Sequence, residues 1–149
     1  RAQRARIWKH ALEPVTYPHS ADSSPRLCTS MIAPVVLASA SASRRAMLEA
    51  AGIGFAVDPA AVDEAEIKKR LKERRAEARE VAETLARLKA EEVSRRHRDA
   101  LVVGSDQMLV CEGRWFDKPE SRAGARDQLL ALKGRRHELI AAVTVVRNG

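Results

Sequence analysis

Short apolar runs alternate along this chain with longer stretches in which apolar residues recur at helical spacing. The apolar runs predict strands over residues 35–38, 55–57, 101–104 and 139–146. The spaced positions, with their capping residues, predict a helix capped by Ser41 or Ser43 that runs to about residue 51, and further helices over about 77–97 and 121–133. Residues 108–116 predict a β-hairpin that turns at Gly113. Strands that alternate with helices indicate the α/β class, and the hairpin makes a mixed sheet the expected form.

The most charged part of the chain is the stretch 66–79. Its seven lysines and arginines would suit an RNA-binding helix, but Glu66, Glu73 and Glu77 interrupt the positive charge. A solvated helical face or loop is therefore favoured over a surface that binds a polyanion.

The two ends of the chain differ from its middle. Residues 1–30 show no sustained period and carry five basic residues against two acidic ones. An arginine-rich start is typical of a transit peptide, but Met31, just before the first strand, favours a disordered extension over 1–30 and a domain over 31–149. At the other end, Asn148-Gly149 is a hairpin-turn signal with no returning strand, so we expect a domain that is incomplete at its C-terminal end.

The amino-acid composition limits the kinds of core and of binding partner that the protein can have. The chain has 149 residues, a net charge of +7 and only 3% aromatic residues, so its core must consist mainly of Ala, Leu, Val and Ile. The positive charge favours anionic partners, and no apolar run approaches the length of a membrane span. Cys28 and Cys111 form neither a metal-binding pattern nor a disulfide framework, so reduced thiols in a cytoplasmic protein are expected.

A loop rich in small and polar side chains follows the first strand: Leu37-Ala38-Ser39-Ala40-Ser41-Ala42-Ser43-Arg44-Arg45. Small side chains let backbone N–H groups approach a ligand, serines donate hydrogen bonds, arginines add charge and the helix N-terminus adds its dipole. These features suit a polyphosphate. An ordinary strand–loop–helix turn with a solvated arginine pair explains them equally well.

Several acidic and basic residues lie at positions suited to chemistry. Asp106 follows a buried strand, where ligands bind in α/β sheets, so we favour a metal-binding or proton-accepting carboxylate over a turn residue. Glu64 and Asp63 could complete an acidic metal site, although alone they would cap the following helix. Lys118 is held extended by Pro119 and could neutralise phosphate, although most such lysines are solvated.

For two further residues, an ordinary structural role competes with a functional one. Lys89 lies near the apolar stripe of the long helix, where a lysine ordinarily extends to solvent. His137 could act as a base, but a surface or half-buried strand histidine is favoured. The sequence contains no Walker phosphate loop, dinucleotide-binding fingerprint, Ser–His–Asp motif or zinc pattern.

In order and spacing, these segments resemble the Maf family of nucleoside triphosphate pyrophosphatases over about residues 35–146. The matching motifs are Leu37-Ala38-Ser39 with Arg44-Arg45, Val62-Asp63-Glu64, Leu85-Ala86 with Lys89-Ala90, Gly104-Ser105-Asp106-Gln107, Lys118-Pro119 and Gly134-Arg135 with His137. The resemblance implies a mixed α/β sheet flanked by helices, like that of Maf and inosine triphosphate pyrophosphatases.

The resemblance also implies hydrolysis of a nucleoside triphosphate to a nucleoside monophosphate and pyrophosphate, with Mg²⁺ or Mn²⁺ as cofactor. Asp106 would be the general base, and Glu64 would hold the metal together with Asp106. The substrate would be bound by Ser39, Arg44, Arg45, Lys89, Gln107 and Lys118. Physical chemistry agrees, because the transition state of this reaction is highly anionic. The alternative is a catalytically inactive fragment that binds nucleotide or RNA.

Within the family, Ser105-Asp106-Gln107 resembles the subgroup that acts on 7-methyl-GTP, whereas the subgroup that acts on dTTP and UTP has Ala-Asp-Thr. Two departures weaken this match. Ala42-Ser43 replaces the usual Pro-Trp, which removes an aromatic side chain that could stack on a base, and Ala141-Ala142 replaces Thr-Gly. The resemblance implies a cytoplasmic protein with a nucleotide as partner, leaves a homodimer open and favours neither a membrane nor a nucleic acid.

Overall fold

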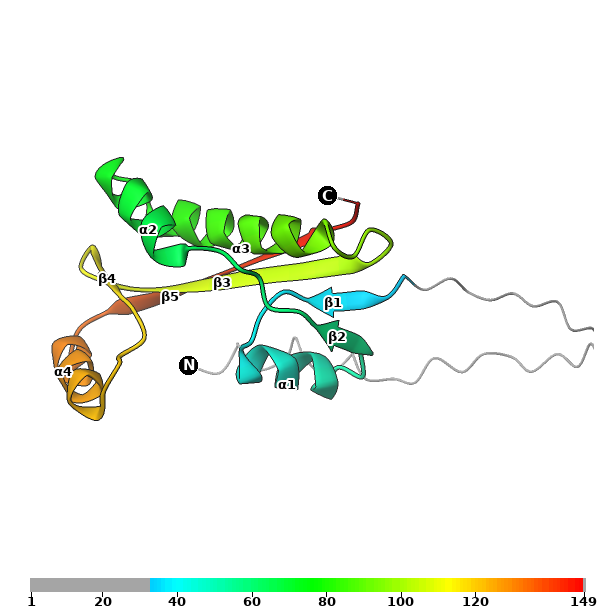
Figure 1. Ribbon diagram of the computed structural model, residues 1–149. Helices are drawn as coiled ribbons and strands as arrows, with labels where there is room; N and C mark the ends of the chain where they lie inside the picture. The colour runs from blue at the N-terminus through cyan, green and yellow to red at the C-terminus, as the bar shows by residue number, and fades with distance from the viewer. Residues whose placement is uncertain (1–32, 149) are drawn as a thin grey trace, which may run out of the picture. The chain divides into compact units, whose positions relative to one another are not determined.

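The computed structural model describes residues 33–148, which form a β-sheet with helices on both sides (Figure 1). The elements in chain order are β1 (Val35–Leu37), α1 (Ala42–Ala50), β2 (Phe55–Val57), α2 (Glu64–Glu73), α3 (Ala78–Ser94), β3 (Leu101–Cys111), β4 (Arg114–Phe116), α4 (Arg122–Leu132) and β5 (His137–Val146). The predicted α/β class with a mixed sheet is confirmed. The extension predicted over 1–30, including Cys28, lies outside the described residues.

β3 is the strand to which the rest of the sheet is attached. β5 pairs antiparallel with β3 along one edge, from Val102 to Cys111. β1 pairs parallel with residues 101–103, β4 pairs antiparallel with residues 109–111, and β2 pairs with β1. Because β5 occupies one edge over nearly the whole strand, β1 and β4 share the other edge. Within the described part of the chain, residues 104–108 therefore have no strand on that edge, and we call this stretch the open edge.

β3 is longer than the sequence predicts. The apolar pattern ends a strand at residue 104 and places Asp106 at its mouth, which is wrong. Pairing with β5 carries β3 through this position, and Asp106 lies opposite Ala142 inside the strand. Asp106 nevertheless lies beyond Val103, the last β3 residue that pairs with β1. The carboxylate therefore still follows the end of the parallel part of the sheet.

The charged stretch and the long predicted helix form two separate helices. Asp63 caps α2 as the sequence suggests, since its Oδ1 accepts a hydrogen bond from the backbone N of Glu66 at 3.0 Å. The chain turns at Arg75, whose φ is 56°. α3 then runs from Ala78 to Ser94 and is shorter at both ends than the predicted range 77–97. The basic residues of 66–79 are thus divided between α2, a turn and the start of α3.

The core lies between α3 and the sheet. The buried residues of α3 recur at helical spacing, and they are Ala78, Val81, Ala82, Leu85, Ala86, Lys89, Ala90, Val93 and Ser94. They pack against the face of β3 that carries Val102 and Met108, both buried. Since side chains alternate along a strand, Gly104 and Asp106 belong to the same face.

The backbone of α3 approaches β3 closely at Gly104. A Cβ atom at this position would lie 2.2 Å from the carbonyl oxygen of Ala86 and 2.7 Å from the backbone nitrogen of Ala90. Only glycine leaves room for the helix backbone here. The contact brings the turn of α3 that contains Lys89 against the part of β3 that contains Asp106.

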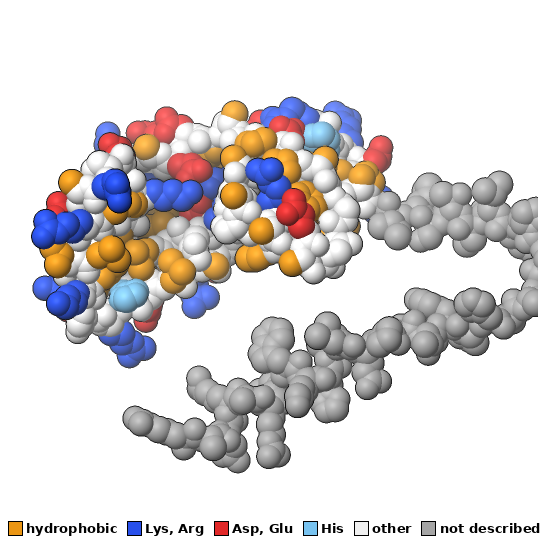
Figure 2. Space-filling model, turned by 90° about the horizontal axis from the view of Figure 1, so that it is seen from below, with side chains coloured by type: hydrophobic (Ala, Val, Ile, Leu, Met, Phe, Trp, Pro, Cys, Tyr) orange, Lys and Arg blue, Asp and Glu red, His pale blue; other side chains and the backbone are white. Residues whose placement is uncertain are grey.

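The opposite face of the sheet is less covered. Alternation along β5 places Leu139, Val143 and Val145 on this face, and their exposed fractions are 61%, 65% and 56%. α1 and α4 lie on this side in Figure 1 and contain no buried residue. Figure 2 shows hydrophobic side chains gathered on the same side. None of the described helices is long and apolar enough to cross a membrane.

A polar cluster joins the end of β2 to the end of α3. Asp58 Oδ2 accepts a hydrogen bond from Arg96 Nε at 3.1 Å and lies 2.8 Å from His97 Nε2, while Arg96 also pairs with Glu92. The hydrogen bond from Arg96, followed by that from His97, holds the pKa of Asp58 below its ordinary value. These contacts attach the β2 end of the sheet to α3.

Gly104→Ala should destabilise the protein, because the added methyl group would overlap backbone atoms of α3. We expect the free energy of unfolding in urea to fall by about 1–3 kcal/mol, as in other overpacked cores. Gly54→Ala is the control, since a Cβ atom there would meet nothing within 4 Å. The control should leave stability unchanged or raise it by up to about 1 kcal/mol. Equal losses in the two variants would contradict the close approach at Gly104.

Asp58→Asn should lower the melting temperature at neutral pH, because it removes the charge bound by Arg96 and His97. A carboxyl group whose pKa is lowered by folding contributes stability that is present above its unfolded pKa, here about 3.8, and is lost as the pH falls through the folded value. The melting temperatures of wild type and variant should therefore differ at pH 7 and converge below about pH 3.8. A difference that stays constant from pH 7 to pH 3 would show that the contact is not electrostatic.

Candidate functional site

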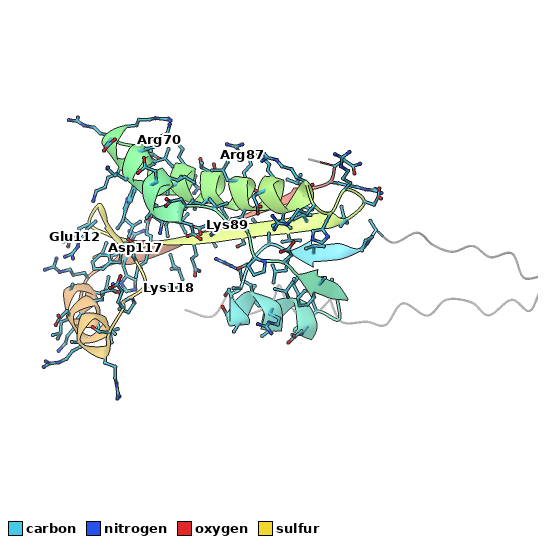
Figure 3. All side chains as sticks on the ribbon, in the orientation of Figure 1. Arg70, Arg87, Lys89, Glu112, Asp117 and Lys118 are labelled. Carbon is cyan, nitrogen blue, oxygen red and sulfur yellow. The ribbon has the colours of Figure 1, made fainter. Side chains whose placement is uncertain are left out.

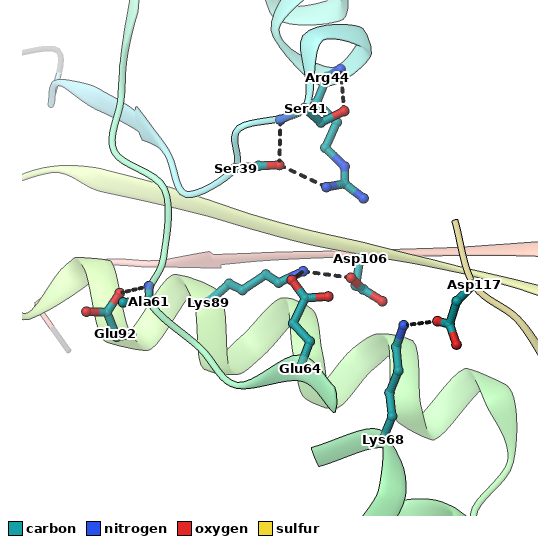
Figure 4. A network of polar contacts seen from close by, with 10 residues as sticks. All are labelled: Ser39, Ser41, Arg44, Ala61, Glu64, Lys68, Lys89, Glu92, Asp106 and Asp117. Carbon is teal, nitrogen blue, oxygen red and sulfur yellow. Dashed lines mark hydrogen bonds and ion pairs between the residues drawn. The ribbon is translucent and has the colours of Figure 1, made fainter. Parts of the chain in front are cut away.

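An ammonium group from α3 lies between two carboxylates that come from different elements (Figure 4). Lys89 Nζ is 2.7 Å from Asp106 Oδ1 and 2.8 Å from Glu64 Oε1. Lys89 and Asp106 are buried, whereas the side chain of Glu64 is 45% exposed. We call these three residues the Lys89 cluster. The expectation that Lys89 extends to solvent is wrong, because its place in the buried stripe turns it toward β3, where two carboxylates compensate its burial.

Asp106 keeps one carboxylate oxygen without a partner. Its Oδ1 binds Lys89, while Oδ2 is buried and has no hydrogen-bond partner among the described residues. Buried polar atoms nearly always have a partner, because leaving one unpaired costs about 1–3 kcal/mol. Oδ2 is therefore the oxygen of Asp106 that is left for a further hydrogen-bond partner, and an ionised carboxylate can accept a proton there.

Residues 37–45, which we call the serine–arginine loop, form the strand–loop–helix turn that the sequence predicts, with the two arginines in the first turn of α1. Ser41 caps α1, and its Oγ accepts a hydrogen bond from the backbone N of Arg44 at 3.5 Å. Ser39 is buried, and its Oγ accepts hydrogen bonds from the backbone N of Ser41 at 3.3 Å and from the Arg44 guanidinium at 2.9 Å. The guanidinium group of Arg44 is thus held against the loop (Figure 4).

The register of the sheet places this loop beside the open edge. Leu37 ends β1 opposite Val103, and the backbone N of Ala38 donates to the carbonyl oxygen of Val103 at 2.9 Å. Ser39 follows at the point where the open edge begins. β4 bounds the other end of the open edge, since it pairs with β3 from Leu109 onward. Asp106 lies between these two limits.

The other predicted site residues lie at the surface. Arg45 is exposed on α1, and Lys118 is exposed in the loop between β4 and α4 (Figure 3). Gln107 is also exposed, and because side chains alternate along β3 it points to the opposite face from Asp106. His137 is an exposed strand residue, as favoured from the sequence, with Nδ1 3.2 Å from the carbonyl oxygen of Arg135.

Two features of the site are absent from the sequence-based prediction. One is an ion pair in which Lys68 Nζ lies 2.6 Å from Asp117 Oδ1. The sequence feature that could have indicated this ion pair is the position of Lys68, four residues after Glu64, which places both side chains on the same side of a helix. The other feature is the close packing of α3 at Gly104. An isolated glycine inside an apolar strand pattern could have indicated it.

The cluster offers two carboxylates to a metal ion, Glu64 and Asp106, and both bind Lys89. No group of three or more His, Cys, Asp or Glu side chains within residues 33–148 could hold an ion. Mg²⁺ usually takes only one or two protein carboxylates and completes its octahedral shell with water and substrate phosphate oxygens. The unpaired Asp106 Oδ2 fits such an ion, provided that a phosphate ligand is present.

Comparison with known proteins agrees with the motifs. Residues 34–149 match the family model described as Maf-like protein. The match includes the Lys89 cluster, the serine–arginine loop and the loop with Lys118. The chain belongs to the Maf family. The resemblance stated from the sequence is thereby confirmed.

Curated Maf relatives carry two different names. A nucleoside triphosphate pyrophosphatase of Paramagnetospirillum magneticum is 54% identical over 114 residues, which are 76% of this chain and 59% of that protein. One of Granulibacter bethesdensis is 50% identical over 115 residues, 77% of this chain and 58% of that protein. A 7-methyl-GTP pyrophosphatase of Rhizobium etli is 42% identical, with the same coverage of both chains. This Maf chain therefore spans less than two thirds of the length of the relatives it matches.

Lys89→Met should strongly destabilise this Maf domain, because the Asp106 carboxylate would stay buried without a counter-charge. Removal of one partner from a buried ion pair costs about 3–5 kcal/mol, measured by urea denaturation at pH 7. Adding Asp106→Asn should recover part of the loss, since no buried charge then remains. Lys72→Met, at an exposed position of α2, is the control. A loss no larger than that of the control would contradict the buried pair.

Proposed function

We propose that this Maf domain hydrolyses a nucleoside triphosphate between its α and β phosphates, giving a nucleoside monophosphate and pyrophosphate. The observation that carries the proposal is the Lys89 cluster, with the unpaired Oδ2 of Asp106, beside the open edge and the serine–arginine loop. The names of the relatives from Paramagnetospirillum magneticum and Granulibacter bethesdensis support the same reaction.

Cationic groups at both ends of the open edge would bind the triphosphate. Arg44, held by Ser39, and the neighbouring Arg45 supply positive charge next to β1. Lys118 supplies it from the loop after β4. Phosphoryl transfer depends mainly on positioning and on stabilising the charge of the phosphate oxygens, so such groups account for most of the expected rate enhancement.

Asp106 would act as the general base. Its Oδ2 would accept a proton from water while the water oxygen bonds to a phosphorus of the α–β bridge. The bridging P–O bond would break, and its electron pair would leave with the departing phosphate group. Lys89 binds the other oxygen of the carboxylate at 2.7 Å and so orients Oδ2 as the oxygen left for water.

We also propose Mg²⁺ or Mn²⁺ as the cofactor, with Glu64 and Asp106 as its protein ligands. When bound, such an ion neutralises phosphate charge and makes a coordinated water easier to deprotonate. Because Lys89 occupies the same two carboxylates, we expect its ammonium group to shift toward a phosphate oxygen when metal and nucleotide are both present.

The favoured substrate that we propose is 7-methyl-GTP. The relatives from Rhizobium etli and Rhizobium meliloti that carry this name are both 42% identical to the chain. The Ser105-Asp106-Gln107 motif points the same way. Ala42 and Ser43 lack an aromatic ring to stack on a base, so we expect weak discrimination among nucleotides. A cytoplasmic location and a homodimer both stay predictions.

Pyrophosphate release from 7-methyl-GTP, GTP, UTP and dTTP tests the proposal, with Mg²⁺, Mn²⁺ or a chelator present. Asp106→Asn keeps the size of the side chain and an acceptor for Lys89 but removes the base. Release should fall by about 10²- to 10⁴-fold. Asp127→Asn, at an exposed position of α4, is the matched control and should leave release unchanged.

Each contrary result has a distinct meaning. Equal release by the two asparagine variants would contradict Asp106 as the base, and release in chelator would contradict the metal. Nucleotide binding in calorimetry without release would indicate the inactive binding protein instead. RNA binding with a steep salt dependence would indicate a phosphate-backbone contact rather than a nucleotide site.

A further inference from the structure

α2 contacts the functional site at two points that are one helical turn apart. Glu64, its first residue, lies 2.8 Å from Lys89 Nζ. Lys68, four residues later, has its Nζ 2.6 Å from Asp117 Oδ1. One turn of helix rises about 5.4 Å, so the Lys68–Asp117 pair lies only a short distance along α2 from the Lys89 cluster (Figure 4).

Asp117 is held from two sides. Lys68 of α2 binds its side chain, and Gln128 of α4 donates a hydrogen bond from Nε2 to its backbone carbonyl oxygen at 2.7 Å. Lys118 comes next in the chain and precedes Pro119, which limits Lys118 to an extended backbone. The segment that carries the Lys118 side chain is therefore anchored at its first residue and restricted at its last.

The charge of Lys68 also matters for Lys118. Asp117 and Lys118 are neighbours in an exposed loop, and the side chain of Asp117 is 70% exposed. An unpaired carboxylate at this position would compete for the Lys118 ammonium and would repel a phosphate bound there. Lys68, whose side chain is 23% exposed, pairs with this carboxylate and leaves Lys118 available to an anion.

We propose that Lys68 is a positioning residue for the triphosphate. By binding Asp117 it fixes the loop that carries Lys118 beside the open edge and neutralises the competing carboxylate. Lys68 itself does not contact the substrate. This role rests on the proposed function and deepens it, because it names how one of the phosphate-binding groups is held in place.

Lys68→Met tests this role through the separation of KM from kcat. The KM for nucleotide should rise about 2- to 5-fold, since a largely exposed ion pair is lost. The kcat should change by less than about twofold, because the Lys89 cluster is intact. Lys68→Arg should restore most of the affinity, since a guanidinium group also binds a carboxylate. Lys69→Met removes the exposed neighbouring lysine and should have the kinetic constants of wild type.

A double-variant cycle distinguishes positioning from a general loss of positive charge. In a Lys118→Met background, Lys68→Met should raise KM by a smaller factor than it does in wild type, because the side chain that it positions is absent and only the repulsion by Asp117 remains. Amide hydrogen exchange in residues 116–122 should be faster in Lys68→Met than in Lys69→Met. Hydrolysis by wild type with equal KM values for these two variants, or additive effects in the cycle, would overturn the inference.

Failure of the proposed function gives a different result. If wild type releases no pyrophosphate, the proposed reaction is wrong, and hydrogen exchange alone then decides whether Lys68 holds the Asp117–Lys118 loop. Equal exchange in Lys68→Met and Lys69→Met would overturn the inference in that case as well.

Discussion

The contacts of the Lys89 cluster depend on how closely α3 lies on β3. The lack of a side chain at Gly104 lets the backbone of Ala86 and Ala90 approach the strand, and this distance sets the reach of Lys89 toward Asp106. A buried ammonium group is tolerated only where carboxylates compensate it. The close packing of α3 on β3 and the pairing of Lys89 with Asp106 therefore depend on each other. If α3 moved away from β3, these two charged side chains would no longer be paired.

The open edge of β3 lies beside this buried pair. β1 ends opposite Val103 and β4 pairs with only three residues of β3, so on this edge Asp106 lies between the two paired stretches, while its other edge pairs with β5. Arg44 comes from the first turn of α1 and Lys118 from the loop after β4, while the carboxylate comes from a continuous strand. The carboxylate proposed as the base thus belongs to a strand paired along its length with β5, and the charged groups expected to bind phosphate come from α1 and from the loop after β4, an arrangement suited to a ligand with several anionic oxygens.

Elements that depend on neighbouring residues could be predicted from the sequence. Capping predicts Ser121 as the cap of α4 and offers Ser41 or Ser43 as the cap of α1, of which the structure uses Ser41. The range 55–57 of β2 follows from its apolar run. The continuation of β3 through Asp106 could not be predicted, because it requires pairing with β5, which comes much later in the chain. The burial of Lys89 could not be predicted either, since both of its carboxylate partners are distant in sequence.

β5 exposes an apolar face and, in the part of the chain described, pairs along one edge only. Such a strand favours association between molecules, because its side chains and its free backbone groups both find partners in a second sheet. The net charge of +7 opposes this association through mutual repulsion. Salt screens that repulsion, so we expect the colloidal stability of the protein to be greatest at low ionic strength, where the attraction for the proposed anionic nucleotide would also be strongest.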